Sequence, residues 1–332
     1  MEASPAGDLR VAVVIPSYRV TRHILGVIAG IGPECCRIYV VDDACPDGSG
    51  PYVQTHCTDP RVRVLLHNLN TGVGGAVITG YRAALDEGMD IVVKIDGDGQ
   101  MDPSLLWEFI EPIIRDEADY TKGNRFYYLD QVRTMPSARL FGNAVLSFMT
   151  KLSSGYWTLF DPTNGYTAIH SDVARKLLLH KLSDRYFFET DVLFRLNLLR
   201  AVVVDVPMDA KYADEESNLH IHKVIGEFMF KHLRNTVKRF FYNYYLRDMS
   251  VASFELPIGL FLLAFAVAFG TYHWIKSAGS NVATPVGTIM IAVVSLLLGV
   301  QLLLAFIGYD IAQVPRRAIH RGRHHAGSRI GK

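Results

Sequence analysis

Short apolar runs alternate with longer stretches of helical spacing over residues 10 to about 215. The runs RVAVVIPSY, RIYVVDDA, RVRVLLHN, DIVVKIDGD and AVVVDVP have the length and the composition of buried strands. Helical spacing lies between them, as in Thr21–Ile31 and in Val73–Glu87, which glycines open. Strands that alternate with helices predict an α/β domain with a mainly parallel sheet.

The last quarter of the chain has a different pattern. No charged residue occurs from Leu256 to Ile275 or from Ser277 to Tyr309. A membrane-spanning helix needs about 20 mostly apolar residues. We therefore predict transmembrane helices at 254–276 and 284–309, joined by a short loop into a hairpin. Two buried helices of a soluble core are the weaker alternative, because such helices rarely go so long without a charge.

Basic residues gather outside this hairpin, at Lys231, Arg234, Lys238, Arg239 and Arg247 before it and Arg316, Arg317, Arg321, Arg323 and Lys332 after it. The loop carries only Lys276. By the positive-inside rule, both ends of the hairpin would face the cytoplasm. The α/β domain and both termini would then be cytoplasmic. Tyr272, Trp274 and Tyr309 have the positions of an interfacial aromatic belt.

Residues 221–250, between the two patterns, mix basic residues with Phe and Tyr at helical spacing. This mixture is typical of a helix that lies in a membrane interface, although an amphipathic helix packed on the domain is the alternative. The resulting division is a flexible tail at 1–9, an α/β domain at 10–218, interfacial amphipathic helices at 219–252, the two spans, and a basic tail at 310–332.

Composition excludes several classes of protein. The 332 residues carry a formal net charge of only +1, so no overall field favours nucleic acid as a partner. The four cysteines all precede residue 58 and form no Cys-x-x-Cys pair, so we expect reduced thiols rather than a zinc site or a disulfide framework. The N-terminal MEASPAGDLR lacks the basic and apolar regions of a signal peptide.

Acidic and amide side chains occupy alternate positions directly after one predicted strand, in KIDGDGQMDP. Ligands bind beyond the carboxyl ends of parallel strands, and alternate positions of an extended chain point the same way. Two carboxylates and an amide suit Mg²⁺ or Mn²⁺, which would neutralise a diphosphate. We therefore predict a metal–diphosphate site at Asp96, Asp98 and Gln100, with Asp102 as a helix cap. A solvated turn is the alternative for such a short motif.

Several motifs in a fixed order support the metal site. VAVVIPSY, YVVDDACPDG, NLNTGVGGAVITGYRAAL, KIDGDGQMDP, GNRF and FDPTNGYTA follow one another between residues 10 and 215. Together they resemble the family-two inverting glycosyltransferases of the GT-A fold. The resemblance is to the branch that makes polyprenyl-phosphate sugars, such as dolichyl-phosphate mannose synthase and bacterial undecaprenyl-phosphate glycosyltransferases. It implies a Rossmann-like GT-A catalytic domain followed by the two-helix hairpin.

The resemblance also implies which residues bind the donor. Nucleotide-sugar binding is implied for Pro16, Tyr18, Asp42, Asp43, Gly72, Lys94, Asp96 and Gly97. Asp96, Asp98 and Gln100 would surround Mg²⁺ or Mn²⁺. Many family members have Asn-Glu after the first-strand tyrosine, where this chain has Arg19-Val20. The sequence therefore does not identify the nucleotide base, uracil or guanine, that the site binds. The glycines from Gly72 to Gly75 either contact the donor or open a tightly packed helix.

Candidates for the acceptor site follow from charge. The planar fork of arginine matches phosphate oxygens, so the candidates for the acceptor phosphate are Arg125, Arg133, Arg139, Ser217 and Lys223, with His222 beside them. Solvated surface charge is the alternative for most of them. Asp161 is either a turn cap or a catalytic carboxylate in the sugar or acceptor pocket. Asp191, with Glu189 nearby, is either a catalytic base or a residue that orients the helix that follows it.

The chemistry of the acceptor decides the mechanism. The second pKa of a phosphomonoester is about 6, so it is already an anionic nucleophile, whereas a hydroxyl acceptor needs a general base. We predict transfer of a hexose, with inversion, from a nucleotide diphosphate sugar to polyprenyl phosphate at the cytoplasmic membrane face. One alternative extends a lipid-linked saccharide at a hydroxyl with Asp191 as base. Another is a non-catalytic scaffold that binds nucleotide sugar. The resemblance also implies a homo-oligomer.

Overall fold

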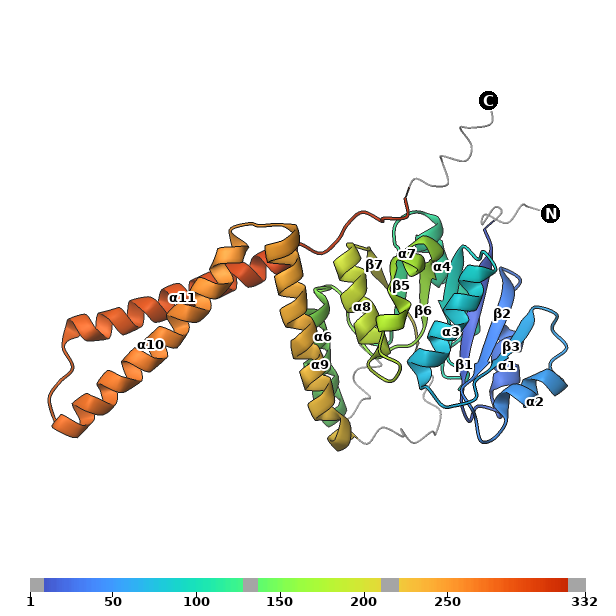
Figure 1. The fold of residues 1–332 in the computed structure, drawn as a ribbon, viewed down its shortest axis with the longest axis horizontal. Helices are drawn as coiled ribbons and strands as arrows, with labels where there is room; N and C mark the ends of the chain where they lie inside the picture. Colours follow the sequence, from blue (N-terminus) through green and yellow to red (C-terminus); the bar gives the residue numbers. More distant parts are fainter. Residues whose placement is uncertain (1–8, 128–136, 210–220, 322–332) are drawn as a thin grey trace, which may run out of the picture. The chain divides into compact units, whose positions relative to one another are not determined.

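The computed structural model describes residues 9–127, 137–209 and 221–321. The chain divides into two compact units (Figure 1). The first comprises residues 1–236 together with 315–332, and the second comprises residues 237–314. Each unit has its own cluster of buried apolar side chains, centred on the sheet in the first and on Tyr244, Ala252 and Phe306 in the second.

The described part of the first unit is built on a seven-stranded sheet with the order β3-β2-β1-β4-β6-β5-β7. The strands are β1 (Val11–Ser17), β2 (Cys35–Asp42), β3 (Val62–Leu66), β4 (Ile91–Lys94), β5 (Tyr120–Asn124), β6 (Thr167–His170) and β7 (Val203–Pro207). Only β6 runs antiparallel to its neighbours, β4 and β5. The prediction of an α/β domain with a mainly parallel sheet is therefore confirmed.

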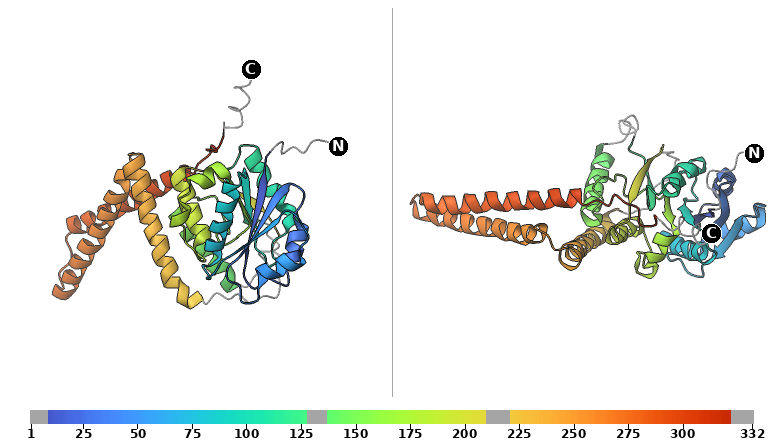
Figure 2. Two further views of the ribbon diagram at one scale, coloured as in Figure 1. Left: turned by 45° about the vertical axis from the view of Figure 1, so that its right-hand side comes forward. Right: turned by 90° about the horizontal axis from the view of Figure 1, so that it is seen from above.

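Helices cover both faces of this sheet (Figure 2). One face carries α1 (Ile24–Gly30), α2 (Ser49–His56) and α4 (Leu106–Ile114), and the other carries α3 (Val73–Asp86), α7 (Ser171–Lys176) and α8 (Phe188–Leu199). Helix α6 (Ser137–Ser154) packs on α8, and α9 (Ile221–Phe241) leads toward the second unit. Two short 3-10 turns lie at Pro103–Leu105 and Leu179–Lys181.

The register of β1 and β4 positions the polar stretch that follows β4. Val14 of β1 pairs with Lys94, the last residue of β4, and the Ile95 N–H donates to the Val14 carbonyl at 3.1 Å. The residues after Lys94 therefore emerge beside the end of β1, at the carboxyl edge of both strands. Helix α3 packs directly on β1, because a Cβ at Gly80 would lie 2.3 Å from a Val14 methyl group.

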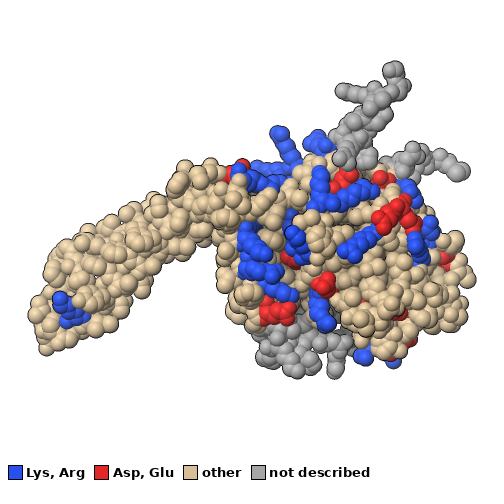
Figure 3. Space-filling model, in the orientation of Figure 1, with Lys and Arg blue, Asp and Glu red and all other residues tan. Residues whose placement is uncertain are grey.

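The second unit is dominated by two long apolar helices, α10 (Ala252–Ser280) and α11 (Val286–Ala312). Both are long and apolar enough to cross a membrane. Helix α10 extends beyond the predicted span at 254–276 on both sides, whereas α11 begins two residues after the start of the predicted span at 284–309 and ends three residues after its end. Figure 3 shows their surface almost without charged side chains, except for a basic group at the loop end. The helices approach closely where a Cβ at Gly299 would lie 3.1 Å from the Gly259 carbonyl oxygen.

A buried ion pair lies at the end of the second unit opposite the loop. The Arg239 guanidinium binds both carboxylate oxygens of Asp310, at 2.6 and 2.8 Å, and the Tyr244 hydroxyl donates to the same carboxylate. The side chains of Arg239 and Asp310 are both 2% exposed. Such a pair is tolerated only when its hydrogen-bonding groups are satisfied. It joins the end of α9 and the π-helical turn Tyr242–Arg247 to the end of α11.

The chain returns to the first unit after the hairpin. The Asp119 carboxylate accepts hydrogen bonds from the backbone N–H groups of Ile319 and His320 and faces His320 Nδ1 at 2.7 Å. The His320 ring is buried and stacks on His170 at 4.2 Å. We expected residues 310–332 to be only a basic tail. Instead, α11 continues to Ala312 and the segment at 315–321 docks on the domain, because the buried imidazole finds acceptors there.

Candidate active site

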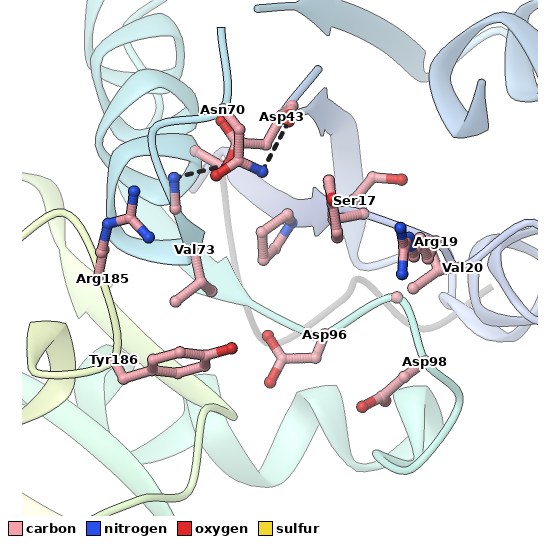
Figure 4. Close-up of a pocket in the computed structure, with 15 residues that line it drawn as sticks. Ser17, Arg19, Val20, Asp43, Asn70, Val73, Asp96, Asp98, Arg185 and Tyr186 are labelled. Carbon is pink, nitrogen blue, oxygen red and sulfur yellow. Dashed lines mark hydrogen bonds between the residues drawn. The ribbon is translucent and has the colours of Figure 1, made fainter. Parts of the chain in front are cut away.

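A cavity of about 600 Å³ opens at the carboxyl edge of β1 and β4. This volume lies in the range of small-molecule pockets. Its walls are Pro16–Val20 after β1, Asp43, Asn70, the start of α3 with Gly72, Val73 and Ala76, Asp96–Asp98 after β4, and the Arg185-Tyr186 pair (Figure 4). Of the predicted donor residues, it therefore brings together Pro16, Tyr18, Asp43, Gly72, Asp96 and Gly97.

Asp96 and Asp98 both reach this cavity, as the metal-site prediction requires. Gly99 has a φ of +79°, a conformation that favours glycine, and lets the chain turn after Asp98. Gln100 does not line the cavity, but its N–H donates to Asp98 Oδ1 at 2.9 Å and so fixes that carboxylate. Asp102 caps the turn that follows, accepting from the N–H and hydroxyl of Ser104 at 3.1 and 2.7 Å.

The donor set fits a small dication. Asp96 keeps 28% of its side chain exposed, and Asp98 is half-buried, so carboxylate oxygens face the cavity. Carboxylate and amide oxygens are the ligands that Mg²⁺ and Mn²⁺ prefer. No group of three His, Cys, Asp or Glu side chains in the described residues could hold a metal by itself. Phosphate oxygens of a bound nucleotide would therefore have to complete such a site.

Lys94 forms a buried ion pair with Asp96. Its ammonium is buried, lies 2.9 Å from Asp96 Oδ1 and 3.2 Å from Glu189 Oε1, and does not line the cavity. Burial alone would lower the pKa of Lys94, but the two carboxylates raise it above its ordinary value. A Cβ at Gly165 would lie 2.3 Å from Lys94 Nζ and 2.4 Å from Asp96 Oδ2, so only glycine leaves room for this cluster.

The two acids after β2 have different environments. Asp43 lines the cavity and accepts from the Thr71 N–H at 2.8 Å, the Thr71 hydroxyl at 2.9 Å and the Gly72 N–H at 2.7 Å. Burial would raise the pKa of Asp43, but these donors and His67 hold it below its ordinary value. Asp42 does not line the cavity and accepts from the N–H groups of Cys45 and Gly50, which stabilises the loop before α2.

The glycines before and within α3 let another loop approach. A Cβ at Gly72 would lie 2.6 Å from the Asp184 carbonyl oxygen, and one at Gly74 would lie 2.4 Å from the Ser183 carbonyl oxygen. The Gly75 N–H donates to the Asp184 carbonyl at 3.0 Å. The tightly packed helix start is therefore present, and Gly72 lines the cavity as well. This packing brings Arg185 and Tyr186 to the cavity.

Arg125 and Asp161 pair with each other outside the cavity lining. Arg125 Nε lies 2.7 Å from Asp161 Oδ2, and Arg125 Nη2 lies 2.8 Å from Asp161 Oδ1. The buried Asp161 has a φ of +49°, and the Lys122 ammonium donates to its backbone carbonyl. Burial would raise the pKa of Asp161, but Arg125 and Lys122 lower it. The Arg125 guanidinium, which we predicted to bind phosphate, is therefore bound to a carboxylate of the protein.

Asp191 also lies away from the cavity lining. Its side chain is only 4% exposed. Asp191 Oδ2 accepts from the Ser183 N–H at 3.1 Å and lies 3.5 Å from Arg195 Nε, while Oδ1 accepts from the Asn235 amide at 3.2 Å. These contacts orient α8 and the loop before it, as in the second interpretation of this residue. Glu189, two positions earlier, is the acid that reaches the Lys94–Asp96 pair.

The remaining acceptor candidates fall where the structure gives no side-chain description. Arg133 and Ser217 lie outside the described residues, as do the side chains of Arg139, His222 and Lys223. The sequence reasoning missed Arg185, Tyr186 and Asn70, which all line the cavity. An Arg-Tyr pair immediately before the FFETD stretch was the available signal for the first two.

Comparisons with known proteins support one family. The model of glycosyl transferase family 2 matches residues 12–178. Undecaprenyl-phosphate mannosyltransferase of Micrococcus luteus is 33% identical over 205 residues, which cover 60% of this chain and 83% of that protein. UDP-N-acetylglucosamine–dolichyl-phosphate N-acetylglucosaminyltransferase of Methanococcus voltae is 27% identical over 66% of this chain and 92% of its own. Polyprenol monophosphomannose synthase of Mycolicibacterium smegmatis is 28% identical over 67% and 85%.

Solved structures show the same fold at lower identity. Glucosyl-3-phosphoglycerate synthase of Mycobacterium tuberculosis, in complex with Mn²⁺, UDP-glucose and phosphoglyceric acid, superposes with a TM-score of 0.52 at 16% identity. The alignment covers 70% of this chain and 80% of that one. The complex of the same synthase with Mg²⁺ and UDP has a TM-score of 0.51 at 17% identity, covering 70% and 79%.

Proposed function

The chain belongs to glycosyl transferase family 2 and has a GT-A-like fold, and from this premise we propose that it transfers a hexose from a nucleotide diphosphate sugar to polyprenyl phosphate, with inversion. One observation carries the proposal. Asp96 and Asp98 face a cavity of about 600 Å³ in a chain that also has two helices long and apolar enough to cross a membrane. The names of its relatives, which specify polyprenyl or dolichyl phosphate, support the acceptor.

The donor would lie with its diphosphate at Asp96 and Asp98. Mg²⁺ or Mn²⁺ held there, with Gln100 as the third predicted ligand, would supply positive charge to the departing nucleoside diphosphate. The ion pair with the Lys94 ammonium orients the Asp96 carboxylate. Asp43, already saturated by Thr71 and Gly72, would fix the wall beside the nucleotide. These preorganised polar groups would suit a reaction in which a diphosphate departs with the electron pair.

The state of Asp191 favours a phosphate acceptor. A phosphate oxygen can attack the anomeric carbon as an anion, while the bond from that carbon to the diphosphate breaks and the electron pair leaves with the diphosphate. Attack from the opposite face inverts the anomeric centre and needs no general base. A hydroxyl acceptor needs one, and the buried carboxylate of Asp191 is held by Ser183, Asn235 and Arg195. Retention of the metal-site residues argues against a non-catalytic scaffold.

A membrane-bound acceptor requires the cavity to work near a bilayer. Two helices of the first unit carry exposed large apolar side chains at helical spacing, which suits contact with a lipid surface. These residues are Phe141, Val145 and Phe148 of α6 and Met229, Phe230 and Leu233 of α9. The hairpin formed by α10 and α11 would anchor the chain in the same membrane.

The connectivity supports an orientation with both ends of the hairpin on one side. The chain belongs to the first unit up to residue 236 and again from residue 315, on either side of the hairpin. A chain that crosses a bilayer twice returns to the side it left. The basic residues that flank the hairpin favour the cytoplasm as that side. The catalytic domain would then use donors and acceptors at the cytoplasmic face.

The proposal is tested with the purified, detergent-solubilised protein, Mg²⁺ or Mn²⁺ and a panel of UDP- and GDP-sugars. Release of nucleoside diphosphate is followed with undecaprenyl phosphate, with dolichyl phosphate and without an acceptor. We expect release that depends on the lipid phosphate and on one sugar donor. Release only with a lipid-linked saccharide would indicate that the acceptor group is a hydroxyl. Release with neither acceptor would contradict the proposed transfer.

A further inference from the structure

Among the residues whose side chains are described, the predicted phosphate-binding arginine does not reach the cavity. A donor diphosphate and an acceptor phosphate both bring negative charge to a cavity whose walls already contain the carboxylates of Asp43, Asp96 and Asp98. Arg125, one of the three arginines predicted to bind phosphate, does not line the cavity and is held by Asp161 at 2.7 and 2.8 Å. A cationic hydrogen-bond donor in the cavity wall would help to hold these phosphate groups beside the metal.

Among the described residues, two arginines line the cavity, Arg19 and Arg185. Figure 4 shows them at opposite ends, with Asp96 between them. The Arg19 guanidinium lies 5.5 Å from the centre of the Tyr18 ring, at the end predicted to hold the nucleotide. Arg185 stands beside Tyr186, whose hydroxyl points toward Asp96 in the same view. Gly72, predicted to bind the donor, lies close to Arg185, because a Cβ there would be 2.9 Å from Arg185 Cγ.

The backbone of Arg185 is held firmly although its side chain is exposed. The preceding carbonyl, that of Asp184, accepts from the Gly75 N–H, and the Ser183 N–H donates to Asp191. The next anchor is the Phe187 side chain, which is 1% exposed. The loop from Ser183 to Phe187 is thus fixed at both ends against α3 and α8. Gly72 and Gly74 are needed for this contact, because a Cβ at either would overlap the loop backbone.

The guanidinium itself has no structural task in the described residues. It makes no hydrogen bond or ion pair with any of them. Glu227 of α9 is influenced by its charge but forms its own ion pair with Lys231 at 2.6 Å. A rigid backbone that presents an unengaged guanidinium to a cavity is the arrangement expected of a ligand-binding arginine, because little has to be ordered when the ligand arrives.

We propose that Arg185 is a phosphate-binding residue of this site, which takes the role that the sequence assigns to Arg125. The proposal rests on the proposed function, since phosphate groups enter the cavity as parts of the donor and the acceptor. Its ligand is a phosphate group, either the diphosphate of the nucleotide sugar or the terminal phosphate of the lipid. The planar fork would donate two parallel hydrogen bonds to phosphate oxygens.

Equilibrium binding tests the proposal without turnover. The full chain in detergent is titrated with UDP or GDP in the presence of Mn²⁺ and, separately, with a short-chain polyprenyl phosphate. The variants are Arg185→Gln, Arg185→Lys and the control Arg82→Gln. Arg82 is an exposed arginine of α3 that does not line the cavity. We expect Arg185→Gln to bind one phosphate ligand about 10- to 100-fold more weakly, and the control to bind both like the wild type.

The two ligands distinguish the sources of the phosphate. Weaker binding of the nucleoside diphosphate alone assigns Arg185 to the donor, and weaker binding of the lipid phosphate alone assigns it to the acceptor. Arg185→Lys should recover part of the affinity, because it keeps the charge and loses the fork. Affinities of Arg185→Gln within twofold of the wild type for both ligands would overturn the proposal, as would a wild type that binds neither.

Binding also separates this proposal from the proposed function. A wild type that binds both ligands but transfers no sugar would contradict the function while the variants still decide the role of Arg185. The melting temperature of each variant is measured alongside. Because the Arg185 side chain is exposed and unengaged, we expect Arg185→Gln to melt within about 2 °C of the wild type. A binding defect that appears only with a lower melting temperature would overturn a direct contact.

Discussion

The two edges of the central sheet both carry acidic residues, but the acids have opposite environments. At the amino edge, Asp119 is fully buried and accepts from Val202, Ile319 and His320. At the carboxyl edge, Asp96 has one protein cation beside it and keeps 28% of its side chain exposed. Hydrogen-bond saturation, more than residue type, therefore separates the structural carboxylate Asp119 from Asp96, which can bind a ligand.

Hydrogen-bond saturation also distinguishes the other candidate acids from one another. Asp161 and Asp191 are buried and saturated by protein donors, so they resemble Asp119 rather than Asp96. Asp98, half-buried at the cavity, resembles Asp96. Variants at the two edges should therefore fail in different ways. Loss at the carboxyl edge should stop turnover in a folded protein, and loss at the amino edge should destabilise a protein whose folded molecules remain active.

The largest effect is expected for Asp98→Ala. Under the proposed function, removal of a carboxylate that would hold the metal beside the departing diphosphate should lower kcat by about a thousandfold or more. The melting temperature should change little, because Asp98 is only half-buried. Turnover and thermal unfolding in detergent are measured together. Activity within a few-fold of the wild type would refute the metal assignment.

A large loss of stability is expected for Asp119→Ala at the amino edge. The substitution leaves buried N–H groups and the His320 imidazole without their acceptor, which should cost about 3–5 kcal/mol of unfolding free energy. The exposed Asp86→Ala is the control and should change stability by less than about 0.5 kcal/mol. Unfolding is followed by denaturant titration. A stable but inactive Asp119→Ala protein would contradict the distinction between the edges.

A smaller effect on turnover is expected for Gly165→Ala. The new Cβ would displace Lys94 and Asp96, because it would lie within 2.4 Å of both side chains. A displacement of about 1 Å at a reacting group can reduce turnover by about a hundredfold. Gly142→Ala is the control, since a Cβ there meets nothing within 4 Å. Equal kcat values for the two variants would show that the Lys94–Asp96 geometry does not matter.

The smallest effect is a pH dependence of the docked segment at 315–321. Burial alone would lower the pKa of His320, but Asp119 and the Ile113 carbonyl raise it above its ordinary value of 6.5. Stabilisation from a raised pKa is complete below the ordinary value and is lost as the pH rises through the folded one. Burial would raise the pKa of Asp119, but its hydrogen bonds lower it, so its contribution is lost only in acid, below 3.8.

We therefore expect the segment to be held most tightly between pH 3.8 and 6.5 and to open progressively as the pH rises above 6.5. Hydrogen exchange of the backbone amides at 316–321, corrected for the intrinsic pH dependence of exchange, measures this opening. His320→Gln should remove the decrease in amide protection that the wild type shows above pH 6.5. Amide protection that increases as the pH rises above 6.5 in the wild type would contradict this role of His320.

Periodicity predicted the elements that local composition controls. Alternating apolar runs predicted the parallel sheet, and the two uncharged stretches predicted helices α10 and α11. The position of Asp96 and Asp98 was also predictable, because the carboxyl edge of a parallel sheet is fixed once β4 is recognised. These features depend on residues that are close together in the sequence.

Features that depend on distant contacts were not predictable. Whether Asp161 or Asp191 has spare hydrogen-bonding capacity depends on Arg125 and Asn235, which lie 36 and 44 residues away. Arg185 has the local sequence of a solvated residue, and only the glycines of α3 bring its loop to the cavity. The docking of His320 on Asp119, 201 positions away, has no periodic signal.

The most direct measurement is the mass of the lipid formed when the wild-type protein is incubated with its sugar donor and a polyprenyl phosphate. We expect a lipid phosphate that is heavier by one sugar residue, formed by the wild type and absent with Asp98→Ala. An unchanged lipid phosphate, together with a lipid-linked saccharide lengthened at a hydroxyl, would contradict transfer to phosphate.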